Sequence, residues 1–249
     1  MTSRDWQMLR GQTLRAMRPF LRRFDVRVSR WSKSYEYQRG RYMRDAGVVA
    51  VVDVGANIGQ YGAELRADGY RGRLLSVEPL EGAFRQLARR SARDPLWACI
   101  QCGLGAQDGG EATLSVSVNG YSSSLLPILD SHVEAAPDSR VQGTEKIRMR
   151  TLDSLVGKWT DQRGAIGLKL DVQGYEAQVL RGASGTLPRV VFLEIELSLV
   201  PLYAGQTLFI DMLEHVRSLG FSLVNVDTGF TDPRTGRVFQ LDGIFLRNQ

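Results

Sequence analysis

The chain has 249 residues, of which 43% are hydrophobic and 24% charged, a composition typical of a soluble globular protein with one substantial core. No run of about 18 apolar residues predicts a membrane-spanning helix, and arginines interrupt each apolar stretch near the N-terminus where a signal peptide would need one. We therefore expect one cytoplasmic α/β domain with appendages.

The basic charge is concentrated in the first 45 residues. They contain 12 Lys or Arg and 4 Asp or Glu, a net charge of +8, whereas the rest of the chain carries −3. Between Trp6 and Phe24, apolar residues recur at near-helical spacing among arginines, which predicts a basic amphipathic helix. Such a helix can lie on an anionic membrane, bind a polyanion, or pack on the domain or on a second subunit. We divide the chain into this helical arm (1–45) and a domain (46–249), and expect peripheral membrane contact or a homo-oligomer contact through residues 1–40.

The domain begins with an apolar strand at 48–54, a glycine-rich turn and a helix at 58–68. Gly55 and Gly59 lie where the chain reverses tightly and a ligand can approach the backbone, which favours residues without a Cβ atom. Asp53 places a carboxylate at the bend. This pattern predicts the first unit of a nucleotide-type cofactor site, and the alternative is an ordinary tight loop.

Asn57 helps to decide which cofactor this turn binds. A dinucleotide site needs a glycine at this position, because the backbone there contacts a pyrophosphate. A side chain crowds a diphosphate, so the turn favours S-adenosylmethionine over NAD. The next strand, at 73–78, ends in Glu78, 19 residues after Gly59, where an acid accepts both ribose hydroxyls. Glu78 supports a nucleoside and is shared with NAD sites.

After a helix at 81–93, the strand at 96–102 contains Cys99 and Cys102 with C-x-x-C spacing. Residues three apart on a strand face opposite sides, and the chain has no second cysteine pair to complete a zinc site. We interpret both as core residues without chemistry.

The segment from about 103 to 160 interrupts the alternation of strands and helices. Residues 111–118 alternate as an edge strand does, and a polar stretch then extends from Asn119 to Gly143. Connections of this length are usually functional lids or disordered segments. Because ligands of such folds bind beyond the carboxyl ends of the strands, we expect a lid over the substrate. His132 lies in it and is a candidate base that reaches the substrate on closure.

Charged residues occupy two predicted core strands, at 165–171 and 189–196. Lys169 and Asp171 lie two residues apart and share a face, as do Glu194 and Glu196. Central parallel strands are normally apolar, so three acids and a lysine at adjacent strand ends predict a functional site. The alternative is a buried Lys169–Glu194 pair that only satisfies a charge.

Further helices are predicted at 175–182 and 206–219, and the last strands at 221–226 and 238–246. A turn-rich loop at 227–236, too short for a helix, joins the last two strands, so they should pair antiparallel. The complete pattern predicts an α/β fold with a seven-stranded sheet, an antiparallel last strand and helices on both faces. This is the Rossmann-like architecture of class I methyltransferases.

Several segments together resemble the FkbM family of S-adenosylmethionine-dependent O-methyltransferases. The resemblance covers about residues 48–247 and implies methylation of a hydroxyl group, commonly on sugars or on glycosylated and polyketide natural products. Many relatives carry Glu at the position of Gln173, where this chain departs from them. The segments are Asp53–Gly62, Ser76–Pro79, Leu168–Gly182 with its D-V-Q-G-Y-E core, Leu193–Glu196 and Asp242–Arg247.

Methyl transfer from a sulfonium to an alcohol is an in-line displacement, so the protein must align the reactants and remove one proton. For the proton we favour Asp171 first and Glu196 second, with Lys169 and Glu194 beside them. Asp171, Glu194 and Glu196 could instead hold Mg²⁺, an alternative that the sequence leaves open. We expect cofactor contacts from Asp53, Gly55, Ala56, Asn57, Gly59, Tyr61, Glu78, Pro79, Gly103 and Asp171.

Other functions fit parts of the sequence. A nucleic-acid N-methyltransferase would suit the basic arm, but such enzymes tend to have a D/N-P-P-Y/F turn, and Asp171–Gly174 lacks its prolines. An NAD-dependent oxidoreductase is disfavoured by Asn57. A membrane- or polyanion-associated accessory protein that binds S-adenosylmethionine is a third alternative, against which the intact acids argue. The expected partner is a small-molecule, glycan or glycolipid acceptor, rather than nucleic acid.

Overall fold

The computed structural model describes residues 34–159 and 164–248, and the chain divides into two units, Met1–Gln38 and Arg39–Gln249. The amphipathic helix predicted between Trp6 and Phe24 lies outside the described residues. The first described helix is α2 (Tyr35–Asp45). Within the described residues, no helix has the length and apolar character needed to span a membrane.

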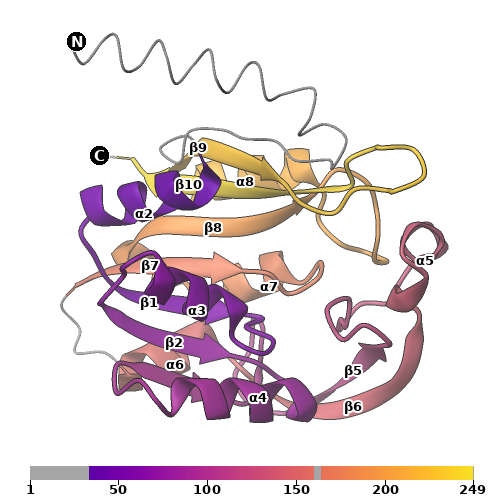
Figure 1. Cartoon of the computed structure of the whole chain (residues 1–249), viewed down its shortest axis with the longest axis horizontal. Coiled ribbons are helices and arrows are strands. Elements are labelled where there is room, and N and C mark those ends of the chain that lie inside the picture. The colour runs from indigo at the N-terminus through magenta and orange to yellow at the C-terminus, as the bar shows by residue number, and fades with distance from the viewer. Residues whose placement is uncertain (1–33, 160–163, 249) are drawn as a thin grey trace, which may run out of the picture. The chain divides into compact units, whose positions relative to one another are not determined.

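The second unit is built on a seven-stranded sheet with the order β3-β2-β1-β7-β8-β10-β9 (Figure 1). β1, β2, β3, β7 and β8 are parallel, and β10 runs antiparallel to both β8 and β9. The predicted seven strands and antiparallel last strand are therefore confirmed. The strands are β1 (Val48–Val54), β2 (Arg73–Val77), β3 (Trp97–Ile100), β7 (Ala165–Leu170), β8 (Val190–Ser198), β9 (Phe221–Thr228) and β10 (Gln240–Arg247).

The strand order has a reversal point between β1 and β7. The chain proceeds from β1 outward to β2 and β3, and then crosses back to place β7 on the other side of β1. In sheets of this kind, ligands bind beyond the carboxyl ends of the strands at such a point. The turns after Val54 and Leu170 therefore mark the place where a site is expected.

Helices cover both faces of the sheet, as predicted. On one face, α6, α7 and α8 contribute buried apolar side chains to the same core cluster as the sheet residues Val52 and Val54. Asp53, the strand position between them, is directed to the other face, where its neighbour Lys169 lies 5.5 Å from the centre of the Tyr61 ring on α3. The helices of this unit are α3 (Gln60–Ala67), α4 (Glu81–Ser91), α5 (Asp130–Ala135), α6 (Leu152–Trp159), α7 (Glu176–Arg181) and α8 (Phe209–Ser218), with 3-10 turns at Pro137–Ser139 and Leu187–Arg189.

The segment predicted as an insertion contains a second sheet and one core helix. β4 (Gly103–Leu104), β5 (Glu111–Ser117) and β6 (Val141–Arg150) pair in the order β4-β6-β5, with β5 and β6 antiparallel (Figure 1). α6 follows, and its Leu152, Leu155 and Val156 are at most 2% exposed in the main core. The insertion therefore ends near residue 150, and the i, i+3, i+4 spacing of these apolar residues was the missed signal of a helix.

Candidate active site

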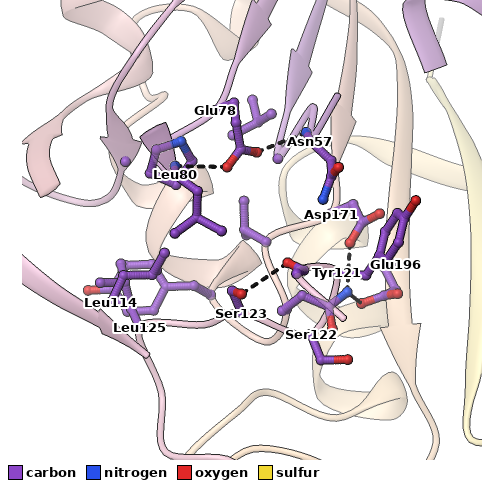
Figure 2. A pocket seen from close by; sticks show the side chains of 18 of the residues that line it. Asn57, Glu78, Leu80, Leu114, Tyr121, Ser122, Ser123, Leu125, Asp171 and Glu196 are labelled. Carbon is purple, nitrogen blue, oxygen red and sulfur yellow. Dashed lines mark hydrogen bonds between the residues drawn. The ribbon is translucent and has the colours of Figure 1, made fainter. Parts of the chain in front are cut away.

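A cavity of about 430 Å³ opens at the carboxyl ends of the central strands, next to the reversal point. Its volume is within the range of small-molecule sites, roughly 300 to 1,000 Å³. In Figure 2, Glu78 and Asn57 lie on one side of the cavity, Tyr121 to Ser123 on another, and Asp171 and Glu196 close the third. Among the predicted site residues, the cavity is lined by Gly55, Asn57, Glu78, Pro79, Gly103, His132, Asp171 and Glu196.

The glycine turn adopts the conformation that its sequence requires. Gly55 and Gly59 have φ values of +79° and +84°, and a Cβ atom on Gly55 would lie 1.8 Å from the Asp171 carbonyl oxygen. Asn57, in place of a glycine, is itself left-handed with φ +47°, a conformation that Asn tolerates better than most residues. Gly55 and Asn57 face the cavity, whereas Ala56 forms part of the buried support beneath it.

Glu78 ends β2 with a carboxylate that the backbone holds on both oxygens. The Asn57 N–H donates to Oε2 at 2.8 Å, and the Leu80 N–H donates to Oε1 at 2.9 Å. Because the side chain is buried, with 5% exposure of the residue, the pKa of Glu78 rises to about 7. A carboxylate has about four acceptor positions, so two remain for the hydroxyls of a ligand. Pro79, Leu80 and Leu104 form an apolar wall beside it.

Asp53 lies beneath the cavity rather than in its wall. It is 1% exposed, accepts a hydrogen bond from Ser76 Oγ at 3.2 Å, and has Lys169 Nζ 3.8 Å from its other oxygen. Burial raises the pKa of Asp53 to about 6, against the opposing effect of Lys169. Lys169 also donates to Asp171 at 3.1 Å, so the predicted Lys169–Asp171 pair is present. Asp53 therefore acts on the cavity through Lys169.

Glu194 binds side chains of α2 and α3 and does not contact Asp171 or Glu196. Its Oε2 accepts a hydrogen bond from the Tyr61 hydroxyl at 2.6 Å, and Arg39 lies 3.9 Å from its Oε1. Arg39 also lies over the Tyr61 ring at 4.9 Å. Tyr61, on α3 directly after Gly59, thus holds α3 against the sheet. Because α3 begins directly after Gly59, these contacts also hold the glycine turn in place.

Gln173 joins Asp171 and Glu196 by hydrogen bonds. Its Nε2 atom donates to Asp171 Oδ1 at 2.8 Å and to Glu196 Oε2 at 3.0 Å. Figure 2 draws these bonds as the dashed lines beside the labels of Asp171 and Glu196. The Tyr203 hydroxyl donates to Gln173 Oε1 at 2.6 Å, which fixes the orientation of the amide. Burial first, and then the nearby Asp171, Glu176 and Asp242, raise the pKa of Glu196 well above its usual range.

The predicted Mg²⁺ ligands do not converge. Glu194 binds Tyr61, while the Gln173 amide places a hydrogen-bond donor between Asp171 and Glu196, where a cation would need oxygen atoms. Across the described ranges, no group of three or more His, Cys, Asp or Glu side chains is arranged to hold a metal ion. The alternative in which Asp171, Glu194 and Glu196 hold Mg²⁺ is therefore not supported, because Glu194 and Glu196 share a strand face but bind different neighbours.

The insertion forms the far wall of the cavity and is fixed to the domain. Ser124 Oγ donates to the Gln173 carbonyl at 2.7 Å, and Ile128 forms an antiparallel bridge with Tyr203. The Leu129 N–H donates to the Leu202 carbonyl at 2.9 Å. These bonds fix one wall of the cavity on the Gln173 turn and on the loop after β8.

His132 already faces the cavity without any closing movement. Its Nε2 lies 3.4 Å from Ser122 Oγ, and its ring packs against Tyr203 and Phe230 at centroid distances of 5.2 and 5.3 Å. Burial lowers the pKa of His132 to about 4, so the ring is neutral at physiological pH. A histidine with this pKa is a weak base, which leaves Asp171 and Glu196 as the stronger candidates for accepting a proton.

Sequence reasoning did not assign several residues of this wall. Tyr121, Ser122 and Ser123 come from the polar stretch after β5. Phe230 comes from the loop between β9 and β10, and Gln240 is the first residue of β10. The polar stretch after residue 118 and the loop at 227–236 were recognised as irregular, whereas Gln240 falls in the strand predicted at 238–246. Their positions depend on how distant segments pack, which no local pattern encodes. Cys102 also lines the cavity, with a thiol pKa raised to about 11 by burial, which fits a role without chemistry.

The strand order, the antiparallel last strand and a ligand cavity at the reversal point define a class I methyltransferase fold. The sequence profile of the Methyltransferase FkbM domain matches residues 53–223, and the chain belongs to this methyltransferase family. The predicted family and fold class are thereby confirmed.

Solved structures with low identity resemble this fold. The methyltransferase FkbM from Methylobacillus flagellatus is 18% identical with a TM-score of 0.48, over 79% of this chain and 43% of that protein. An rRNA methylase from Streptococcus thermophilus is 13% identical with a TM-score of 0.47, over 87% and 98%. Magnesium protoporphyrin IX methyltransferase from Synechocystis, solved with bound S-adenosylmethionine, is 10% identical with a TM-score of 0.44, over 94% and 91%. No curated protein sequence matches the chain.

Proposed function

We propose that the protein is an S-adenosylmethionine-dependent O-methyltransferase that acts on a sugar hydroxyl of a glycan, glycolipid or glycosylated natural product. The observation that carries this proposal is that one cavity joins Glu78 to the Asp171–Gln173–Glu196 cluster. Glu78 is suited to a nucleoside diol, and the cluster is suited to a hydroxyl that loses its proton. S-adenosylmethionine, when bound, supplies an electrophilic methyl group on a sulfonium.

The half of the cavity that contains Glu78, the cofactor half, has the hydrogen-bond acceptors and the apolar surface that S-adenosylmethionine needs. Glu78 presents two acceptor positions that the backbone does not use, and these match the two ribose hydroxyls. Leu80, Leu104 and Pro79 offer an apolar surface to the adenine ring. Asn57 lines the cavity at the turn where a dinucleotide site has a glycine, and a side chain at that position crowds a diphosphate.

The other half of the cavity, which contains Asp171 and Glu196, would hold the methyl acceptor and is called the acceptor half. Its side chains would orient a hydroxyl and take its proton. Lys169 Nζ lies 3.1 Å from Asp171 Oδ2 and orients this carboxylate at the cavity wall, where it is the proposed base. Glu196 lies beside it, held by the same Gln173 amide at 3.0 Å, and can orient a second oxygen of the sugar. A positioned base of this kind contributes roughly 10²- to 10⁴-fold in rate.

Methyl transfer from tritiated S-adenosylmethionine to a panel of glycosides, glycans and glycolipids tests the function. The wild type should label at least one acceptor, and Asp171→Asn should bind the cofactor normally but lose at least 99% of turnover. Asp211→Asn, which changes an exposed acid on α8, is the matched control. Full turnover by Asp171→Asn would exclude the assigned base. Tight cofactor binding with no transfer to any acceptor would favour the accessory-protein alternative.

A further inference from the structure

The acceptor half of the cavity is strongly acidic. Among the described residues, three acids line the cavity, and two of them, Asp171 and Glu196, belong to this half. Behind Glu196, the adjacent strand β10 places Asp242 directly opposite it, and β9 places Asp227 opposite Asp242. Acids on three neighbouring strands therefore lie in one row that ends at the cavity.

Nearby bases do not cancel this charge. Lys169 divides its interactions between Asp171 at 3.1 Å and Asp53 at 3.8 Å, so one cation faces two acids. His132, the basic side chain in the cavity wall, is held neutral by burial. An anion placed beside Asp171 and Glu196 would be repelled, and the repulsion is stronger in a partly buried cavity than in water.

The same half of the cavity presents aromatic surface. The Phe230 and His132 rings lie 5.3 Å apart and are tilted by 38°, and both line the cavity. Tyr121, which is 59% exposed, also lines it. Its hydroxyl accepts a hydrogen bond from Gln60 Nε2 at 3.3 Å. Carboxylates that bind hydroxyls, next to aromatic faces that pack on C–H groups, form a surface complementary to an uncharged sugar ring.

We propose that the acceptor half selects a sugar ring that carries no negative charge, and that Asp171 and Glu196 exclude phosphorylated forms of the same ring. This inference rests on the proposed function and narrows its substrate class. A sugar bound to a nucleoside diphosphate has a phosphate directly on its ring and would bring negative charge into this half of the cavity. The reaction that supplies the substrate is therefore a glycosyl transfer, which releases the diphosphate, and methylation follows on the finished glycoside.

Binding to the protein saturated with S-adenosylhomocysteine tests this selection without knowledge of the natural acceptor. Ligand-observed NMR would compare matched pairs, the methyl glycoside and the 1-phosphate of glucose, galactose, mannose and rhamnose, at low ionic strength. At least one methyl glycoside should bind tenfold or more tightly than its 1-phosphate. Glu196→Gln should reduce this ratio at least threefold, because it replaces a carboxylate with an uncharged amide of similar shape. Asp242→Asn, outside the cavity wall, should reduce it less, and Asp211→Asn should leave it unchanged.

The outcomes separate this inference from the proposed function. If S-adenosylhomocysteine binds but a 1-phosphate binds as tightly as its methyl glycoside, the charge selection is wrong and the methyltransferase proposal stands. If S-adenosylhomocysteine binds but neither member of any pair does, the inferred ring-binding surface is also wrong. If S-adenosylhomocysteine itself does not bind, the proposed function fails, and this inference fails with it.

Discussion

Replacement of Glu78 by Gln tests the cofactor half of the cavity. The substitution keeps the size of the side chain but turns one acceptor oxygen into an NH₂ donor. That donor would face the N–H of Asn57 or of Leu80, which now donate to the two oxygens at 2.8 and 2.9 Å. It also removes one acceptor for a ribose hydroxyl. A hydrogen bond to a charged group contributes about 1.5 to 3 kcal/mol.

The expected result is a cofactor affinity that falls by about 10- to 150-fold, since 1.4 kcal/mol corresponds to a factor of ten. Isothermal titration with S-adenosylhomocysteine measures it, with circular dichroism to verify folding. Glu81→Gln is the matched control, because Glu81 lies three residues away on the exposed start of α4 and pairs with Arg85. A loss of less than threefold in Glu78→Gln would refute the assignment of Glu78 to the ribose.

The same site should show a pH dependence. The pKa of free Glu78 is raised to about 7 by burial, and hydroxyl donors favour its ionised form. Cofactor affinity should therefore weaken as the pH falls through about 7, with uptake of one proton by the free protein. Titrations between pH 6 and 8 measure this slope. Glu78→Gln should lose it, and an equal slope in that variant would assign the titration to another group.

Three further predictions concern the scaffold. Gly55→Ala should destabilise the protein by about 3 kcal/mol or more in urea unfolding, because its Cβ would meet a backbone oxygen. Gly82→Ala, with open space around it, is the control and should change stability by about 1 kcal/mol or less. Similar losses of stability in both variants would contradict the tight turn. In a Cys99→Ser variant, Cys102 should resist thiol reagents at pH 8 until the protein unfolds, and rapid labelling of the folded protein would contradict its burial. Because the folded-state pKa of His132 is about 4 and the unfolded value about 6.5, stability should fall as the pH drops from about 6.5 to 4, by up to about 3 kcal/mol. His132→Asn should show a smaller fall, and an unchanged one would show that other groups dominate.

The sheet could be predicted from the sequence because its signals are local. The β-branched runs, the glycines after Val54 and the short loop before β10 each determine one element or one connection. The same holds for the Lys169–Asp171 pair, because residues two apart on a strand share a face. The three-stranded sheet of the insertion was missed except for β5. Its β6 has exposed residues along much of its length, so it lacks the apolar alternation that marks a half-buried strand.

The hydrogen-bond partners of Glu194 and Gln173 could not be predicted from the sequence. Strand periodicity places Glu194 and Glu196 on one face, but Glu194 binds Tyr61 from α3, and Glu196 binds Gln173 from the turn after β7. These partners come from segments far apart in the chain. Gln173 was noted only as a departure from relatives. Its bridging role follows from its left-handed backbone, with φ +54°, and from Tyr203, which orients the amide.

A crystal structure of the protein with S-adenosylhomocysteine tests the central claim most directly. The account predicts that the ribose hydroxyls bind the Glu78 carboxylate, and that the sulfur lies on the side of the cavity where Asp171 and Glu196 meet. The adenine should pack against Leu80 and Leu104. A ligand bound elsewhere, or a ribose that does not touch Glu78, would contradict it.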